Sequence, residues 1–297
     1  MDSDFEQLPA AIAGRGISVV MPAKNEGRSI GALVEAVRRN HPDCEVIVVD
    51  DGSTDDTAAE ASASGAKVIS HRYSKGNGAS IKTGARAASR QVIVFLDGDG
   101  QHSPADIPRL LESIEAGADM AIGARDSASQ ASIFRHTGNW LYNRLATWIT
   151  GHKVLDLTSG FRAVDARKFR EFLFLLPNGF SYPTTITMAF FRTGYTVEYI
   201  PIRAAQRRGK SHLKLWRDGV KFFLIIFRLC TLYSPLKIFF PVAMVQGILA
   251  ACYYAYTYLE FGRLTNMTAV LLTGGLITFM FGLLSEQITA LIFRKDS

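Results

Sequence analysis

Two long apolar stretches near the C-terminus constrain this chain more than any other feature. Residues 236–259 read LKIFFPVAMVQGILAACYYAYTYL and hold one lysine, close to their start, while residues 267–284 read MTAVLLTGGLITFMFGLL and hold no charge. A helix that crosses a bilayer needs about 20 mostly apolar residues. The alternative, two helices buried in a protein core, fits less well, because core helices rarely remain uncharged over such lengths. We predict two transmembrane helices within residues 235–297.

The charges around these stretches predict their orientation. Arg228 and Lys237 lie at the entrance to the first stretch, and Arg294 and Lys295 follow the second. The short link between the stretches carries one arginine and one glutamate. Because positive residues favour the cytoplasmic side of a membrane, we expect both chain ends in the cytoplasm and the link outside. Small residues at 274–275 would support helix packing and allow a homo-oligomer.

A basic segment precedes the apolar stretches. The whole chain carries a formal net charge of +6, which indicates an anionic partner such as nucleic acid, a membrane surface or phosphate. In residues 211–233, lysines and arginines interrupt a surface rich in Phe and Leu. This pattern is typical of amphipathic helices in a membrane interface, although an ordinary surface helix can share it. Because the segment adjoins the first span, we expect interfacial helices at 206–234 and no nucleic-acid partner.

The first two thirds of the chain alternate between short apolar runs and helical patterns. The runs are continuous and β-branched, which is typical of strands buried on both faces of a parallel sheet. We therefore predict an N-terminal tail at 1–16 and an α/β domain at 17–205 that binds ligands beyond the carboxyl ends of its strands. The expected strands are 17–21, 45–49, 66–70, 91–96 and 119–123, and the expected helices lie near 28–39, 55–64, 76–89 and 104–116.

Two carboxylates follow the fourth expected strand. The sequence VIVFLDGDGQH places Asp97 and Asp99 directly after an apolar run, with Gly98 between them. Like charges this close repel each other, and one would take up a proton unless a cation lies nearby. Mg²⁺ and similar ions are usually held by one or two carboxylates together with substrate phosphates. Such a triplet also occurs in solvated turns, but here two other strands end in polar groups, at 22–26 and 50–51.

Other nucleotide-binding motifs do not fit the sequence. The pairs of glycines at 14–16 and 76–78 both lack the third glycine of a GxGxxG fingerprint, and the Gly-Lys-Ser at 209–211 lacks the upstream glycine of a P-loop. These absences disfavour a Rossmann dehydrogenase and a P-loop kinase.

Four motifs, in order along the chain, resemble a known family. PAKNE at 22–26, VVDDGSTDDT at 48–57, LDGDGQH at 96–102 and DLTSGFRAV at 156–164 together resemble the family 2 glycosyltransferases of GT-A fold. The resemblance covers about residues 17–235. It is strongest for the polyprenyl-phosphate branch, similar to dolichyl-phosphate mannose and glucose synthases, in which paired C-terminal spans also occur. Such enzymes transfer a sugar, with inversion, from a nucleotide sugar to dolichyl or undecaprenyl phosphate.

The resemblance implies roles for the matching positions. The residues expected to bind the nucleotide are Pro22, Lys24, Glu26, Val49, Asp51, Asp97 and Gly98. The residues expected to hold a divalent cation, Mg²⁺ or Mn²⁺, are Asp97, Asp99 and Gln101. The residues expected to bind the diphosphate and the acceptor phosphate are Arg125, Arg135, Arg207 and Arg208. The expected catalytic residues are Asp99, Asp156 and Arg125.

The acceptor side departs from the family pattern. Where the family often has an arginine three residues before the glycine of a GxSK segment, this chain has Gln206, and His212 replaces the lysine. Arg207 or Arg208 would then take over the phosphate contact. A lipid phosphate is largely dianionic at neutral pH, since its second pKa is about 6, so it needs charge screening more than a strong base. Asp156 would therefore orient the sugar or the arginines, with a role as general base as the alternative.

The sequence leaves the donor open. The overall resemblance favours a UDP-linked hexose or N-acetylhexosamine, with GDP-mannose as the alternative. A different class of protein, a membrane-anchored subunit that binds nucleotide sugars without catalysis, is disfavoured by the intact DGDGQ motif and the arginines. The catalytic domain is expected on the cytoplasmic side, where the enzyme would supply a lipid-linked sugar for glycan or glycoprotein assembly.

Overall fold

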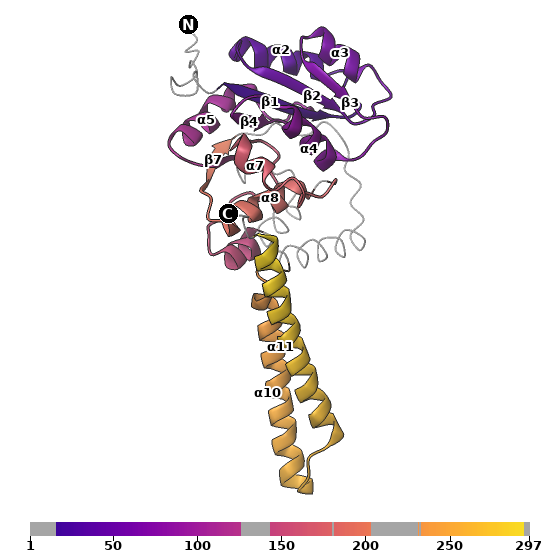
Figure 1. The fold of residues 1–297 in the computed structure, drawn as a ribbon, viewed down its shortest axis with the longest axis vertical. Coiled ribbons are helices and arrows are strands. Elements are labelled where there is room, and N and C mark those ends of the chain that lie inside the picture. The colour runs from indigo at the N-terminus through magenta and orange to yellow at the C-terminus, as the bar shows by residue number, and fades with distance from the viewer. Residues whose placement is uncertain (1–15, 126–142, 180, 203–230, 232, 294–297) are drawn as a thin grey trace. The chain divides into compact units, whose positions relative to one another are not determined.

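The computed structural model describes residues 16–125, 143–179, 181–202, 231 and 233–293 (Figure 1). The chain divides into two compact units, one of residues 1–148 and 152–212 and the other of residues 149–151 and 213–297. The first unit contains an α/β domain and the second a helical hairpin. The interfacial helices expected at 206–234 lie almost wholly outside the described residues.

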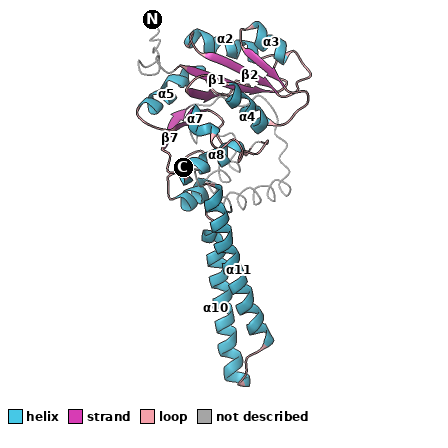
Figure 2. Cartoon of the chain, in the orientation of Figure 1, coloured by secondary structure: helices cyan, strands magenta, loops and turns pink. Residues whose placement is uncertain are grey.

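A seven-stranded sheet forms the centre of the α/β domain (Figure 2). Its strands are β1 (Ile17–Ala23), β2 (Glu45–Asp50), β3 (Lys67–Ser70), β4 (Val92–Phe95), β5 (Met120–Arg125), β6 (Arg162–Asp165) and β7 (Val197–Ile202). They lie in the order β3-β2-β1-β4-β6-β5-β7, and all neighbours are parallel except β6, which is antiparallel to β4 and β5. The mostly parallel sheet that the sequence predicts is confirmed, and the five expected strands are β1 to β5.

Helices follow most of the strands. They are α2 (Ile30–Asn40), α3 (Thr57–Ala63), α4 (Asn77–Ala87), α5 (Ile107–Glu115), α7 (Ala166–Arg170) and α8 (Tyr182–Arg192), with a 3-10 turn η1 (Pro104–Asp106) before α5. Residues 143–150 are also helical. The helix expected at 104–116 is thus present as η1 followed directly by α5.

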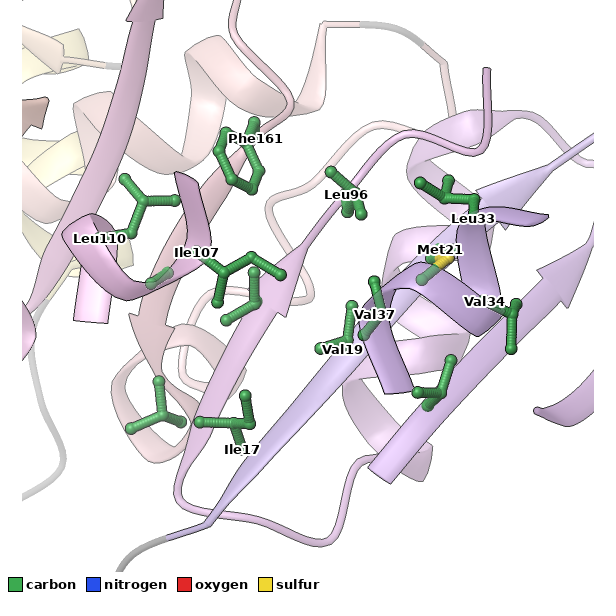
Figure 3. Packing of buried hydrophobic residues seen from close by; sticks show 14 of the residues in the cluster. Ile17, Val19, Met21, Leu33, Val34, Val37, Leu96, Ile107, Leu110 and Phe161 are labelled. Atoms are coloured by element: carbon green, nitrogen blue, oxygen red, sulfur yellow. The ribbon is translucent and has the colours of Figure 1, made fainter. Parts of the chain in front are cut away.

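The two faces of the sheet pack against different helices. Val19 and Met21 of β1 are fully buried in a cluster that includes Val34 of α2 and side chains of α5 (Figure 3). Successive residues of a strand point to opposite faces, so Val20 faces α4. There Gly84 lets the helix approach the sheet, since an added Cβ would lie 2.2 Å from Val20 Cγ1. Burial on both faces explains why the strands read as continuous apolar runs.

The strand directions bring several polar segments to one edge of the sheet. The parallel register pairs Ala23 at the end of β1 with Asp50 at the end of β2, and β4 reaches Phe95 alongside β1. Because β6 runs the opposite way, it starts at this edge, where its first residue, Arg162, pairs with Phe95. The segment at 156–161 therefore lies at the same edge as the residues that follow β1, β2 and β4.

The second unit is a hairpin of two long helices, α10 (Leu236–Phe261) and α11 (Asn266–Ile292). Their mean hydropathy reaches 1.7 and 2.0, and only 11% and 17% of their most apolar segments are buried. Both helices are long and apolar enough to cross a membrane, as the sequence predicts. The helices pack closely at Gly282, where an added Cβ would lie 2.7 Å from Phe239 Cβ.

Candidate active site

A cavity of about 540 Å³ opens at the carboxyl edge of the sheet. Its volume lies in the range of about 300–1,000 Å³ that is usual for small-molecule sites. The predicted site residues that line it are Pro22, Lys24, Glu26, Asp51, Asp97, Gly98, Asp99, Gln101 and Arg125. The fold therefore gathers residues that are far apart in the chain around one ligand-sized space.

The loop after β1 is fixed by the loop after β2. Asn25 has a positive φ of 56°, a conformation that asparagine tolerates better than most residues. Its main-chain N–H donates to Ser53 Oγ at 2.9 Å, and its side-chain oxygen accepts from the N–H of Thr54 at 2.9 Å. The N–H of Glu26 donates to Thr57 Oγ1 at 2.9 Å. These bonds hold the flanking side chains of Lys24 and Glu26 at the cavity.

Asp51, at the end of β2, anchors the segment at 71–76. Its carboxylate accepts hydrogen bonds from four groups at 2.7–2.8 Å, which are His71 Nδ1, Ser74 Oγ and the main-chain N–H groups of Lys75 and Gly76. Burial acts to raise the pKa of Asp51, but these bonds outweigh it and lower the pKa to about 2. A carboxylate offers about four acceptor positions, so all those of Asp51 are occupied by the protein.

Asp97 and Asp99 form the acidic part of the cavity. Gly98 allows this turn to approach β1, since its N–H donates to Pro22 O at 3.3 Å and an added Cβ would lie 3.0 Å from that oxygen. Burial, and then the neighbouring Asp99, raise the pKa of Asp97 to about 6 against the opposing charges of Arg162 and Arg125. Within the described part of the chain, neither carboxylate has a salt bridge.

The donor set of this acidic pair fits a divalent cation. A cation would offset both the burial and the repulsion by Asp99 that raise the pKa of Asp97. Carboxylate and amide oxygens are suitable ligands for Mg²⁺ or Mn²⁺. Asp99 Oδ1 accepts from the N–H of Gln101 at 3.1 Å, so the three predicted ligands lie on one turn. Among the residues described, no group of three or more His, Cys, Asp and Glu side chains could hold a metal. The remaining ligands would thus come from phosphate oxygens or water.

Arg125 and Asp156 form a two-point ion pair. Arg125 Nε donates to Asp156 Oδ2 at 2.7 Å, and Nη2 donates to Oδ1 at 3.0 Å. Thr158 adds two further bonds to Asp156 Oδ1, from its N–H and its hydroxyl. Burial acts to raise the pKa of Asp156, but the hydrogen bonds and the charge of Arg125 lower it overall. Arg125 lines the cavity, whereas Asp156 is not among the lining residues.

The remaining predicted residues are placed differently. Val49 is fully buried in β2 and does not line the cavity. Arg135, Arg207 and Arg208 lie outside the described residues.

Several lining residues were not predicted from the sequence. They are Ala23, Ser74, Gly76, Asn77, Ser80, Thr158, Gly160, Tyr182 and Pro183. Thr158 and Gly160 belong to the DLTSGFR motif, of which only Asp156 was singled out. Gly160 is required for close packing, because an added Cβ would lie 2.5 Å from Asp97 Oδ2.

Comparison with known proteins identifies the family. The model described as glycosyl transferase family 2 matches residues 18–173, and the model described as GtrB C-terminal hairpin matches residues 234–291. The chain belongs to glycosyl transferase family 2. It is a glycosyltransferase with a GT-A-like α/β domain, and the resemblance seen in its motifs is confirmed.

Similar proteins extend the comparison. Glycosyltransferase AglJ of Haloferax volcanii is 27% identical over 93% of this chain and 94% of its own length. Polyprenol monophosphomannose synthase of Mycolicibacterium smegmatis is 31% identical over 64% of this chain and 77% of its own. Dolichyl-phosphate hexose transferase of Haloferax volcanii is 28% identical over 72% of this chain and 93% of its own.

A solved structure shares the fold of this family 2 chain. Glucosyl-3-phosphoglycerate synthase from Mycobacterium tuberculosis, in complex with Mn²⁺, UDP-glucose and phosphoglyceric acid, superposes with a TM-score of 0.61. The match has 25% sequence identity and covers 77% of this chain and 84% of that chain.

Proposed function

We propose that this chain transfers a hexose or N-acetylhexosamine, with inversion, from a nucleotide sugar to a polyprenyl phosphate at the cytoplasmic face of a membrane. The observation that carries the proposal is one cavity that joins Asp97 and Asp99 to Arg125, in a family 2 chain with two span-length helices. Two relatives support the acceptor, because their names refer to polyprenol and to dolichyl phosphate. The product would be a lipid-linked sugar for glycan or glycoprotein assembly.

A UDP-sugar is the proposed donor. Its support is the neighbouring structure of glucosyl-3-phosphoglycerate synthase, which contains UDP-glucose. Most of the residues proposed to bind the nucleotide line the cavity, while Val49 is buried and would contribute only through its main chain. Asp51 would accept from the base by giving up one of its present bonds, for example that of the Ser74 hydroxyl.

A divalent cation, Mg²⁺ or Mn²⁺, is proposed to be held by Asp97, Asp99 and Gln101. When bound, it would stabilise the negative charge of the departing nucleoside diphosphate. The Mn²⁺ in the structure of glucosyl-3-phosphoglycerate synthase supports this assignment. The half-buried carboxylates of Asp97 and Asp99, which have no salt bridge among the described residues, support it independently.

The acceptor phosphate needs positive charge more than it needs a base. With a second pKa of about 6 it is largely dianionic at neutral pH, and its approach to a diphosphate is opposed by repulsion. Arg125, which lines the cavity, would offset this repulsion, because a guanidinium matches phosphate geometry. Arg135, Arg207 and Arg208 are proposed to assist. A phosphate oxygen then attacks C1 of the sugar while the bond from C1 to the nucleoside diphosphate breaks.

Asp156 is proposed to position Arg125 rather than to act as a base. Its hydrogen bonds to Arg125 and Thr158 lower its pKa, which makes the carboxylate a weak proton acceptor. The same bonds fix the guanidinium plane of Arg125 beside the cavity.

The test is release of nucleoside diphosphate by the purified full-length protein, with Mn²⁺ or Mg²⁺ and undecaprenyl phosphate. We expect turnover that requires both the metal and the lipid, and at least a 100-fold loss in Asp99→Asn. Asp106→Asn is the matched control, because Asp106 is an acidic residue outside the cavity. Equal activity on a glycan hydroxyl without the lipid would contradict the proposed acceptor.

Two alternatives to the proposed function can be distinguished with the same purified protein. GDP-mannose as donor is favoured by the relative named polyprenol monophosphomannose synthase, and a panel of UDP- and GDP-sugars, with lipid products read by mass spectrometry, decides between them. A non-catalytic subunit would bind a nucleotide sugar in calorimetry and yet give no lipid product with any donor.

A further inference from the structure

Two polar groups without hydrogen-bond partners lie beside the cavity. In the described part of the chain, the hydroxyl of Tyr182 and the side-chain oxygen of Asn77 are buried and unpaired. Both residues line the cavity, and Tyr182 is only 1% exposed. Buried polar groups nearly always have a partner in a protein or in ordered water. Their presence together at one cavity indicates a ligand that supplies the missing partners.

The two side chains come from the first residues of α4 and α8, and the protein holds these helix starts together. Lys82 Nζ of α4 donates to Leu176 O at 3.1 Å, and the N–H of Ala79 donates to Asn178 O at 3.2 Å. The segment at 176–179 precedes α8 in the chain. One main-chain contact and one lysine side-chain contact therefore hold the start of α4 against the segment that precedes α8, independently of any ligand.

The surroundings of these two groups favour a neutral ligand. Asn77 makes a side-chain hydrogen bond to Asp97, and neither Asn77 nor Tyr182 supplies the positive charge that a phosphate requires. Burial, and then the charge of Asp97, raise the pKa of Tyr182, so its phenol stays neutral. Arg162 stacks behind the ring at 5.9 Å but is fully buried and does not line the cavity. A neutral ligand with several donors and acceptors, such as a sugar, fits this wall.

Positively charged groups also line the cavity. Lys24 and Arg125 line it and supply the positive charge that a diphosphate requires. The cavity lining therefore offers both cationic groups and neutral amide and phenol groups. A nucleotide sugar has groups that match both kinds, because its diphosphate is charged and the hydroxyls of its sugar are not.

We propose that Asn77 and Tyr182 form a subsite that binds hydroxyl groups of the donor sugar and helps to determine which sugar is transferred. The inference rests on the proposed function, since it takes a nucleotide sugar as the ligand. Tyr182 would contribute its hydroxyl as donor or acceptor, and Asn77 its unpaired amide oxygen as acceptor. The nucleotide itself would not contact either group.

The experiment compares a nucleotide with its sugar-bearing form. The full-length protein in detergent, with Mn²⁺, is titrated with UDP and UDP-glucose, and in parallel with GDP and GDP-mannose. The variants are Tyr182→Phe and Asn77→Ala, and Tyr199→Phe is the matched control. Tyr199 also has a buried, unpaired hydroxyl, but it does not line the cavity.

The affinity gained from the sugar is the ratio of the Kd for the nucleotide to the Kd for the nucleotide sugar. We expect this ratio to fall about three- to tenfold in Tyr182→Phe and in Asn77→Ala, as for loss of one hydrogen bond. Affinity of Tyr182→Phe for the nucleotide alone should stay within about twofold, and Tyr199→Phe should resemble the unmodified chain. Because the removed hydroxyl has no partner in the protein, Tyr182→Phe should not lower the thermal unfolding midpoint.

Other outcomes would overturn the subsite. If a variant lost equal affinity for the nucleotide and for the nucleotide sugar, its residue would have a general structural role. A lowered unfolding midpoint together with these losses would indicate the same. Unchanged sugar affinity in Tyr182→Phe, or the same change in Tyr199→Phe, would also reject it. A chain that binds neither UDP nor GDP would reject the proposed function as well, whereas normal nucleotide binding with no effect of the variants rejects the subsite alone.

Discussion

Arg125 provides the sharpest test at the scale of single residues. Its two bonds to Asp156 require the guanidinium fork, and a lysine ammonium cannot make both. We expect Arg125→Lys to lower kcat/KM with undecaprenyl phosphate by about 10- to 100-fold, as for loss of one charged hydrogen bond. Steady-state kinetics with the lipid varied would measure the loss. Arg109→Lys is the control, because Arg109 pairs with Asp106 at 3.2 Å outside the cavity. Equal kinetics in Arg125→Lys and the unmodified chain would remove Arg125 from the proposed phosphate contact.

Asp51 gives a prediction about pH. Its pKa is lowered to about 2 in the folded chain, compared with about 3.9 for an unperturbed aspartate. A lowered pKa stabilises the fold at pH values above about 4, and the stabilisation is lost as the pH falls towards 2. We expect Asp51→Asn to unfold at a lower temperature than the unmodified chain at pH 6. The difference between the two unfolding temperatures should be smaller at pH 3.

Differential scanning fluorimetry at both pH values, in detergent, would measure this gap. Asp43→Asn serves as the control, because Asp43 is exposed and lies outside the Asp51 network. A gap that stays constant between pH 6 and pH 3 would show that the hydrogen bonds of Asp51 stabilise the fold without depending on its charge.

The same residues show what the sequence could and could not predict about the site. Asp97 and Asp99 were predictable because they directly follow an apolar strand, and a parallel sheet gathers such strand ends. Asn77 and Tyr182 were not, because they begin helices and reach the cavity only through contacts made elsewhere in the fold. In the sequence, the glycines around Asn77 indicate only an incomplete dinucleotide fingerprint.

At the scale of elements, the contact between α4 and β1 depends on one glycine. An added Cβ at Gly84 would lie 2.2 Å from Val20 Cγ1, so Gly84→Ala would push the helix away from the sheet. Overpacking of this kind typically costs about 1–3 kcal/mol, and we expect a corresponding fall in the unfolding midpoint. Gly179→Ala is the matched control, because an added Cβ there meets nothing within 4 Å. An unchanged midpoint in Gly84→Ala would mean that α4 can shift without loss of packing.

The strand β6 marks the limit of prediction at this scale. Strands β1 to β5 could be predicted because each is a local apolar run. β6 has only four residues, Arg162–Asp165, and its fully buried first residue is an arginine. Its place between β4 and β5 is determined by pairing with strands distant in sequence. That antiparallel insertion carries Gly160 to the cavity and Asp156 to Arg125.

For the whole molecule, the span-length helices were the most predictable feature. Their length and lack of charge follow from the thickness of a bilayer rather than from any tertiary contact. We propose the division into a tail at 1–16, a catalytic domain at 17–205, interfacial helices at 206–234 and two spans at 235–297. Orientation is a separate matter, because it depends on charges outside the helices.

Orientation can be tested by cysteine labelling in intact cells. The charge distribution predicts that the link at 262–265 lies outside and the catalytic domain inside. In a chain with its three cysteines replaced, Arg263→Cys should therefore react with a membrane-impermeant maleimide in intact cells. Ser62→Cys, at an exposed position of α3, should react only after the cells are permeabilised. The reverse pattern would place the catalytic domain outside, where a cytoplasmic nucleotide sugar could not reach the cavity, and would contradict the proposed function. Labelling of both positions in intact cells would show that they lie on the same side of the membrane, and would contradict the predicted hairpin.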